Sequence, residues 1–274
     1  MKVLLLLPLL AGCATMTDQP PSAPEPPPAP VRILAVFAHP DDETVAGPAL
    51  ANAARRGAHV RIVFATRGDA SAPETDLVPG PAIAARRTEE ARCAASALGA
   101  AEPVFYDFGD GKLGEIVRPP AGTLRTLKHA LAATIAAERP DIIVTWGPDG
   151  GYGHPDHRLV TAVTSEIVAS QGNRPLLLYA AAALGELPQV PMVQATGWAE
   201  TAPDLLTVRA RFEPQDLAAA SRAFACHASQ YDAASRGALV PLFGSVTWKD
   251  GVPFRPALDG AVGHDLLSLR RTTR

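Results

Sequence analysis

The chain has 274 residues, 47% of them hydrophobic, and a formal net charge of −3. That length fits one α/β domain of roughly 250 residues behind a processed N-terminus. A charge this small gives no electrostatic case for a nucleic-acid partner. No apolar run approaches the ~20 residues that a membrane-spanning helix needs.

The N-terminus has the pattern of an export signal. Met1-Lys2 precedes a short apolar run, and small residues lead to Cys13. This arrangement resembles a bacterial lipobox, in which the cysteine is lipidated after cleavage; the alternative is an ordinary secretory signal with an incidental cysteine. We expect a lipoprotein signal peptide over 1–12, a lipidated Cys13 with a proline-rich tether over 13–30, and a domain over 31–274. Lipid chains would anchor that domain at the bacterial cell envelope, on its periplasmic or extracytoplasmic side, without a spanning helix.

From Val31 onward, apolar strand-like runs alternate with helical stretches. Strands are expected at 31–37, 59–64, 103–106, 141–145, 176–179 and 205–208, and helices at 49–56, 83–98, 121–138, 155–170 and 215–228. The alternation predicts a single Rossmann-like, doubly wound α/β domain, with helices on both faces of a mostly parallel sheet. In the strand order 3-2-1-4-5, a crevice opens at the carboxyl ends of the first and fourth strands. The tail from Gly237 has no assignment.

Acidic and histidine side chains follow those two strands. Ala38-His39-Pro40-Asp41-Asp42-Glu43 comes after the first, and Gly153-His154-Pro155-Asp156-His157 after the fourth. Grouped carboxylates repel one another and lose hydration when they are partly buried, and a cation removes both penalties. Two imidazoles and one carboxylate are the ligand set of a catalytic zinc, so we assign His39, Asp42 and His157 to Zn²⁺ or another divalent cation.

Three neighbouring residues are given catalytic roles. Asp41 can accept a proton from water on the metal, whose pKa zinc lowers to about 7. His154 can donate to a developing oxyanion or to the leaving nitrogen. Asp156 is expected to hold His154 in the right tautomer and keep it protonated.

These motifs resemble the PIG-L/LmbE-like N-acetylglucosaminyl de-N-acetylases, a metal-dependent family with a Rossmann-like fold. The matching segments are Ala38-His39-Pro40-Asp41-Asp42-Glu43, Thr66-Arg67-Gly68-Asp69, Arg87-Thr88-Glu89-Glu90, Gly153-His154-Pro155-Asp156-His157 and His227-Ala228-Ser229-Gln230. The resemblance implies the same metal ligands, the same base and the same electrophilic partner. It also implies that Arg87 contacts substrate, although Arg86 beside it leaves the register open. Arg67, Tyr152 and Gln230 complete the expected substrate-binding set.

We therefore expect a zinc-dependent N-deacetylase that removes an acetyl or other acyl group from an amino sugar or a related amine. The substrate would be an N-acylated sugar, a glycolipid or a small molecule. Two alternatives stay open: a non-catalytic, surface-tethered carbohydrate-binding lipoprotein of the same fold, and a non-haem iron oxygenase, which uses a similar ligand set.

Several residues have two interpretations. Glu43 is either a partner of a site residue or a helix N-terminal acid, and Arg86 to Glu90 are either part of the site or a solvated helix face. His227 and Gln230 either line the site or cap a helix end. Cys93 and Cys226 can pair in an oxidising compartment, but two unlinked buried thiols are the default expectation.

Overall fold

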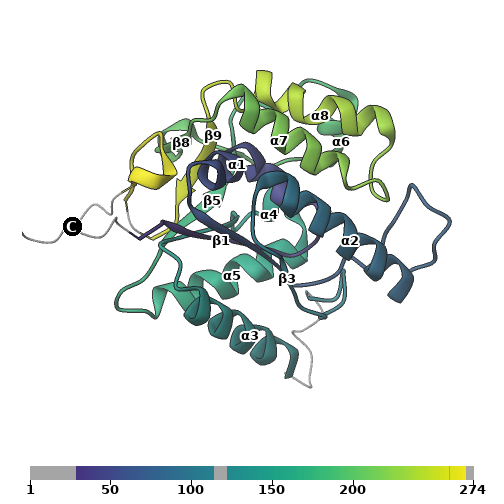
Figure 1. Ribbon diagram of the computed structural model, residues 1–274, viewed down its shortest axis with the longest axis horizontal. Coiled ribbons are helices and arrows are strands. Elements are labelled where there is room, and N and C mark those ends of the chain that lie inside the picture. The colour runs from purple at the N-terminus through teal and green to yellow at the C-terminus, as the bar shows by residue number, and fades with distance from the viewer. Residues whose placement is uncertain (1–28, 114–121, 259, 270–274) are drawn as a thin grey trace, which may run out of the picture.

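The computed structural model describes residues 29–113, 122–258 and 260–269. Its seven-stranded sheet has the order β3-β2-β1-β4-β5-β9-β8 (Figure 1). The first five are parallel neighbours: β3 (Val104–Phe105), β2 (His59–Phe64), β1 (Arg32–Phe37), β4 (Ile142–Trp146) and β5 (Leu176–Ala180). Antiparallel pairing adds β9 (Val252–Pro256) and then β8 (Val208–Ala210). The doubly wound α/β fold and the order 3-2-1-4-5 are confirmed, and β1 lies beside β4.

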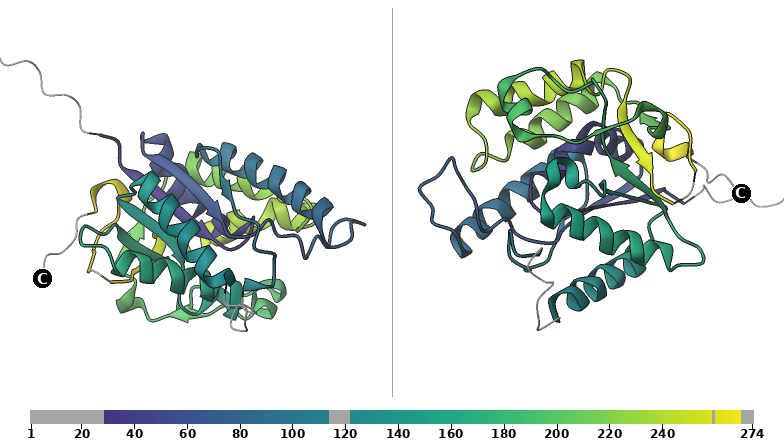
Figure 2. Two further views of the ribbon diagram at one scale, coloured as in Figure 1. Left: turned by 90° about the horizontal axis from the view of Figure 1, so that it is seen from below. Right: turned by 180° about the vertical axis from the view of Figure 1, so that it is seen from behind.

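Helices cover both faces of the sheet, because alternate strand residues point to opposite sides and most of them are apolar on both sides. In β1, Ile33 and Phe37 belong to one core cluster and Leu34 to the other. The first face is covered by α1 (Gly47–Arg55), α2 (Pro81–Leu98), α7 (Pro214–Ala225) and α8 (Ala233–Ser245). The second face is covered by α3 (Gly122–Glu138) and α5 (Pro155–Ala169), as Figures 1 and 2 show.

Short elements connect these layers. They are η1 (Asp42–Ala46), α4 (Gly150–Gly153), β6 (Ala182–Ala183), α6 (Pro191–Thr196), β7 (Glu200–Thr201), η3 (Pro203–Leu205) and η4 (Leu266–Ser268). Most of them lie near the carboxyl ends of the strands, whereas η4 lies at the amino ends. The strand expected at 205–208 is displaced: Pro203 begins a 3₁₀ turn, and the strand itself starts at Val208. A proline is well suited to the first position of such a turn, because it has no N–H to leave unpaired.

A disulfide joins Cys93 of α2 to Cys226 at the end of α7, with the Cα atoms 5.9 Å apart. The expectation of two unlinked thiols was therefore wrong. The residues are 133 positions apart in the chain, and only the side-by-side packing of α2 and α7 brings them together. The bond ties the helix before the His227 segment to the layer that covers β1 and β2.

The predicted signal peptide over 1–12, the lipidation site Cys13 and most of the tether over 13–30 lie outside the described residues. They stay predictions. Within the residues that are described, no helix has both the length and the hydropathy to cross a bilayer.

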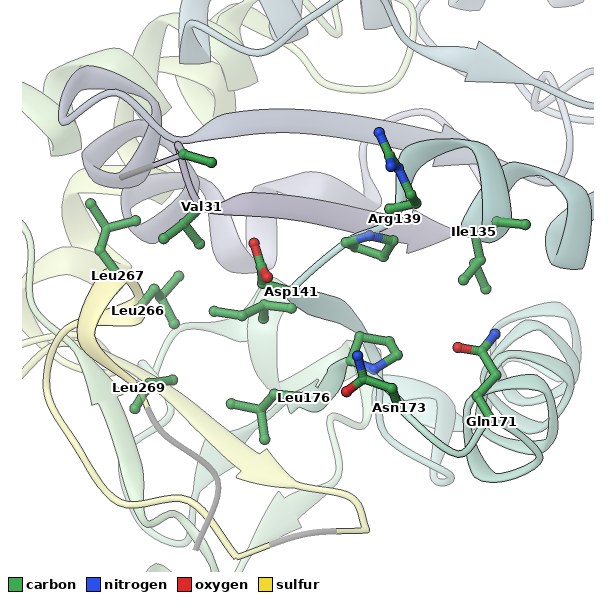
Figure 3. A pocket seen from close by; sticks show the side chains of 15 residues that line it. Val31, Ile135, Arg139, Asp141, Gln171, Asn173, Leu176, Leu266, Leu267 and Leu269 are labelled. Carbon is green, nitrogen blue, oxygen red and sulfur yellow. The ribbon is translucent and has the colours of Figure 1, made fainter. Parts of the chain in front are cut away.

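A cavity of about 750 Å³ lies at the amino ends of the strands (Figure 3). It is lined by Val31, Leu176 and the segment around η4, and no histidine or cysteine is among its described lining residues. Its carboxylate, Asp141, accepts a hydrogen bond from the backbone N–H of Arg32 at 2.8 Å. The side chains that the sequence predicts to bind a metal lie at the other end of the sheet, beyond the carboxyl ends of β1 and β4.

Candidate metal centre and active site

Three side chains from the ends of β1 and β4 meet at one point. Nδ1 of His39 lies 3.1 Å from Nε2 of His157, and that nitrogen lies 3.1 Å from Oδ1 of Asp42. Nδ1 of His39 is 3.8 Å from the other oxygen of Asp42. Ligand atoms of a tetrahedral zinc ion, each at 2.0–2.2 Å, are separated by about 3.3 Å. The spacing of these three side chains therefore fits a single zinc-sized ion.

Hydrogen bonds on the far side of each imidazole turn its lone pair toward that point. Nδ1 of His157 lies 3.0 Å from the carbonyl oxygen of Gly150 and donates to it, which leaves Nε2 as the acceptor. Nε2 of His39 lies 3.0 Å from a carboxylate oxygen of Asp110 and 3.3 Å from one of Asp156, so it carries the proton. Such outer partners fix the tautomer of metal-binding histidines. Two lone pairs and one carboxylate thus converge, and acceptors in this arrangement require a cation.

The charge of the cluster gives the same result. Burial lowers the pKa of His39, but hydrogen bonds with Asp110 and Asp156 and the charge of Asp42 outweigh it and raise the pKa to about 10. Burial acts to raise the pKa of Asp42, yet the two imidazoles hold it well below its usual range. In the absence of a metal ion, a proton on His39 therefore supplies the positive charge between these side chains.

A tight glycine loop brings His157 into place. Gly150 and Gly151 have φ of 74° and 76°, a conformation that favours glycine. A Cβ on Gly151 would lie 2.6 Å from the ring of Trp146. That ring stacks in parallel on His157, with centroids 5.0 Å apart. The absence of side chains at these glycines therefore lets the loop approach the site closely.

Asp41 lies next to the ligands in a strained conformation. Its φ of 103° is rare for a residue other than glycine, and such strain gathers at functional sites. Its carboxylate lies 3.3 Å from Nη2 of Arg87 and accepts a hydrogen bond from the hydroxyl of Tyr231 at 3.3 Å. Burial raises the pKa of Asp41, and Arg87 offsets only part of that rise. A carboxylate with a raised pKa beside a metal centre is suited to accept and return a proton.

A buried pair holds Asp41 from behind. The carboxylate of Glu43 accepts the backbone N–H of Asp41 at 3.0 Å and lies 2.6 Å from Nε2 of His227. Glu43 and His227 are almost completely buried. Of the two interpretations of Glu43, the structure supports the partner of a site residue. His227 lies in the wall behind the site rather than at an exposed helix end.

His154 stands beside the metal cluster, with its ring stacked on His157 at a centroid distance of 4.5 Å. One nitrogen from each of His39, His154 and His157 lies within 4.8 Å of the others. The structure corrects the expected role of Asp156: it is the backbone N–H of Asp156 that donates to Nδ1 of His154, at 3.2 Å. Burial and the charges of His39 and His157 lower the pKa of His154, although the charge of Asp156 acts to raise it. The lowered pKa favours a neutral ring, which would donate from Nε2.

The structure separates the two arginines that the sequence left ambiguous. Arg86 points outward to pair with Glu90, whereas Arg87 is 3% exposed. The guanidinium of Arg87 donates to the backbone carbonyls of Pro40 and Gly68 and faces Asp41. With these contacts Arg87 positions the Asp41 loop; direct substrate contact stays a prediction. The interpretation of this segment as a solvated face fails for Arg87, and also for Glu90, which is 4% exposed.

The other three predicted substrate-binding residues lie in different places. Tyr152 is 38% exposed and packs edge-on against His154 and His157, so it borders the site. Arg67 instead donates to the hydroxyl of Thr88 and lines a separate surface hollow. Gln230 donates to the carbonyl of Ser71 at 2.7 Å and ties the loop after α7 to the loop after β2.

Two site residues were missed from the sequence. Asp110, in the turn after β3, faces both His39 and Arg87. Its position after a third parallel strand was the available signal, because all the carboxyl ends meet at one edge of the sheet. Tyr231 donates to Asp41 from the loop between α7 and α8, and no local motif marks it beyond the adjacent Gln230.

Comparison with known proteins now adds to this geometry. The PIG-L family, described as GlcNAc-PI de-N-acetylase, matches residues 34–168. A 1D-myo-inositol 2-acetamido-2-deoxy-alpha-D-glucopyranoside deacetylase of Thermobifida fusca is 33% identical over 219 residues, which cover 68% of this chain and 74% of the relative. The enzyme of that name from Rhodococcus erythropolis is 36% identical over 160 residues, covering 50% and 52%. The chain thus spans about half the length of several curated relatives that it matches.

Solved structures share the fold. The A40926 pseudoaglycone deacetylase Dbv21 superimposes with a TM-score of 0.59 at 21% identity, covering 83% of this chain and 96% of that one. At this identity the likeness concerns the backbone architecture. The sheet that carries β1 and β4 therefore belongs to a backbone fold found in other solved structures.

Proposed function

The chain belongs to the PIG-L family, and from that premise we propose that it is a metal-dependent hydrolase that removes an N-acyl group from an amino sugar. Zn²⁺ is the ion we propose. The single observation that carries the proposal is the meeting of His39, Asp42 and His157 at mutual distances of 3.1–3.8 Å beside the strained Asp41.

The residues divide the work of amide hydrolysis between them. A divalent ion held by His39, Asp42 and His157 would supply Lewis acidity, which polarises the amide carbonyl and acidifies the attacking water. Asp41 takes one proton from that water as its oxygen bonds to the acyl carbon. His154 donates a hydrogen bond from Nε2 to the developing oxyanion or to the leaving nitrogen. When the C–N bond breaks, the proton held by Asp41 goes to the amine. The acyl group leaves as a carboxylic acid, which gives its remaining proton to the amine or to solvent.

Substrate class follows from the relatives and from the site edge. The curated relatives are named as deacetylases of an acetamido-glucopyranoside. In this chain, Tyr152 presents a partly exposed aromatic ring beside the metal centre, and such a ring suits the apolar face of a sugar. An N-acyl glucosamine unit is therefore the substrate that we propose.

Acetate release from N-acetylglucosamine and its glycosides tests the proposal. We expect turnover by the zinc-loaded protein and a loss of about 10²- to 10⁴-fold in Asp41→Asn, which removes the proton acceptor but retains the shape. Equal zinc content in the two proteins would separate proton transfer from metal binding. Turnover by Asp41→Asn at the wild-type rate would contradict the proposed role.

We also propose that the domain works at the cell envelope, tethered through Cys13. The disulfide between Cys93 and Cys226 supports this location, since such bonds persist in oxidising compartments. Fractionation of cells expressing the full chain tests it. Wild type should sediment with membranes and Cys13→Ser should not; an equal distribution of both would contradict the anchor.

A further inference from the structure

A second cavity, of about 190 Å³, opens beside the catalytic carboxylates. Asp41 and Asp42 contribute to its lining together with Thr44. Most of the remaining lining is apolar or aromatic: Val45, Trp146, Tyr152, Met192, Val193, Trp198, Phe224, Tyr231, Leu239, Val240, Phe243 and Trp248. An apolar hollow that reaches the reacting centre can hold part of a substrate.

Much of the aromatic wall of this cavity comes from the segment around α6 and from α8, which were not assigned from the sequence. Trp198 lies 5.6 Å from Trp146 and 6.0 Å from Phe243 between ring centroids, and Phe243 lies 5.5 Å from Trp248. These contacts join α6 and the residues after it to α8. Met192 is 43% exposed, so one part of the lining reaches the surface. The ring-to-ring packing makes a fixed hollow.

The position of the catalytic groups decides which part of the substrate enters. The acyl carbon carries an oxygen, the leaving nitrogen and the acyl chain. His154, the proposed donor to the oxygen or the nitrogen, does not line the cavity, whereas Asp41 does. With the amine on the His154 side, the acyl chain extends past Asp41 into the apolar hollow.

We infer that this cavity binds the acyl chain, and that the enzyme prefers N-acyl amino sugars with chains of about six carbons over N-acetyl ones. This rests on the proposed hydrolase function and names its substrate class more closely. A cavity of roughly 150 Å³ lined by apolar side chains holds a benzene molecule. The 190 Å³ here therefore leaves most of its space empty beside a methyl group and suits a hexanoyl chain.

The test is a chain-length series of N-acyl glucosamines: acetyl, butanoyl, hexanoyl and decanoyl. Zinc-loaded protein is assayed for the free amine, which every substrate releases together with its carboxylate. Burial of each methylene gains roughly fourfold in kcat/KM. We expect a rise on the order of 100-fold from acetyl to hexanoyl and a fall at decanoyl.

Two matched variants on α6 test the location. Thr196 lines the cavity and Ala195 does not, although both are exposed. Thr196→Phe should reduce the preference for hexanoyl over acetyl at least roughly tenfold, whereas Ala195→Phe should change kcat/KM for either substrate by less than about twofold. Phe243→Ala should move the optimum toward decanoyl, because it enlarges the hollow.

The outcomes separate this inference from the proposed function. If acetyl is hydrolysed and longer chains give no gain, the acyl assignment is wrong and the hydrolase proposal stands. An N-acetyl phenyl glucosaminide tests the other side of the amide. If the phenyl group raises kcat/KM over that of N-acetylglucosamine, and Thr196→Phe abolishes this rise, the cavity holds the amine side of the substrate. The inference then fails. If no substrate is hydrolysed, both proposals fail.

Discussion

Nδ1 of His39 and Nε2 of His157 lie 3.1 Å apart, although 118 positions separate the two residues. The opposite nitrogen of each ring donates to a carboxylate or a carbonyl, so the two facing nitrogens are both acceptors once His39 has lost the proton that its raised pKa retains in the absence of a metal. Two acceptors at this distance repel unless a cation lies between them. The proposed metal site depends on the short distance between these two nitrogens.

Glu43→Gln should slow turnover without removing the metal. Glu43 holds the backbone N–H of Asp41 and pairs with the buried His227. The amide keeps the shape but loses the charge that binds His227, so the Asp41 loop is no longer held in its strained conformation. We expect kcat to fall about 10- to 100-fold, as for other outer partners of metal sites, while KM and zinc content stay within about twofold.

Glu89→Gln is the control for that prediction. Glu89 is also a glutamate on the first face, but its side chain is 70% exposed and pairs with Arg92 at the surface. Surface substitutions of this kind leave activity within about twofold. If Glu43→Gln behaved like Glu89→Gln, Glu43 would have no role in positioning Asp41.

Reduction of the disulfide should destabilise the domain. The bond closes a loop of 133 residues between α2 and α7. Loss of a native disulfide costs about 2–5 kcal/mol. Cys93→Ser and Cys226→Ser should therefore lower the free energy of unfolding by similar amounts in chemical denaturation. A reductant should lower it in wild type and change neither variant; an equal effect on all three proteins would show that the bond contributes nothing.

Acid should weaken the contact between α1 and α7 at Asp216. Burial acts to raise the pKa of Asp216, but hydrogen bonds from Arg55, Asn52 and the backbone of Glu213 hold it below its usual range. An aspartate in the unfolded chain has a pKa near 3.9. As the pH falls, the unfolded chain is therefore protonated at this residue before the folded chain is. The contribution of ionised Asp216 to the free energy of unfolding is complete above about pH 4 to 5. It is lost as the pH falls through the lowered pKa that Asp216 has in the folded chain.

Asp216→Asn measures that contribution. At neutral pH it should lower the free energy of unfolding by about 1 kcal/mol through loss of the capping box with Glu213. The ion pair with the partly exposed Arg55 adds little, because solvent screens it. The difference from wild type should shrink below about pH 4, whereas the exposed Asp204→Asn should show no such convergence. A constant difference across the pH range would contradict the assigned pKa shift.

The centre of the fold could be predicted because its signals are local. Runs of apolar residues predicted the first five strands, and the neighbouring positions of the first and fourth strands placed His39 near His157. The metal cluster follows from topology alone. Asp110 was not predicted as a site residue, because a single aspartate beside glycines is also common in ordinary turns.

The C-terminal third resisted prediction for reasons that lie in its prolines. Pro241 is inside α8, where a proline ordinarily ends a helix. Pro253 and Pro256 belong to β9, which lies between β5 and β8 although proline is depleted from interior strands. This region supplies the larger part of the lining of the acyl-chain cavity, so no sequence pattern indicated that cavity.

Zinc binding by wild type and by His157→Asn tests whether His39, Asp42 and His157 hold one ion together. Both proteins are reconstituted, dialysed and titrated against a competing chelator, with circular dichroism to confirm folding and exposed His129→Asn as the control. We predict about one zinc ion per chain for wild type and His129→Asn, and an affinity at least roughly tenfold weaker for His157→Asn. Equal zinc affinity in wild type and a folded His157→Asn would contradict the shared metal centre.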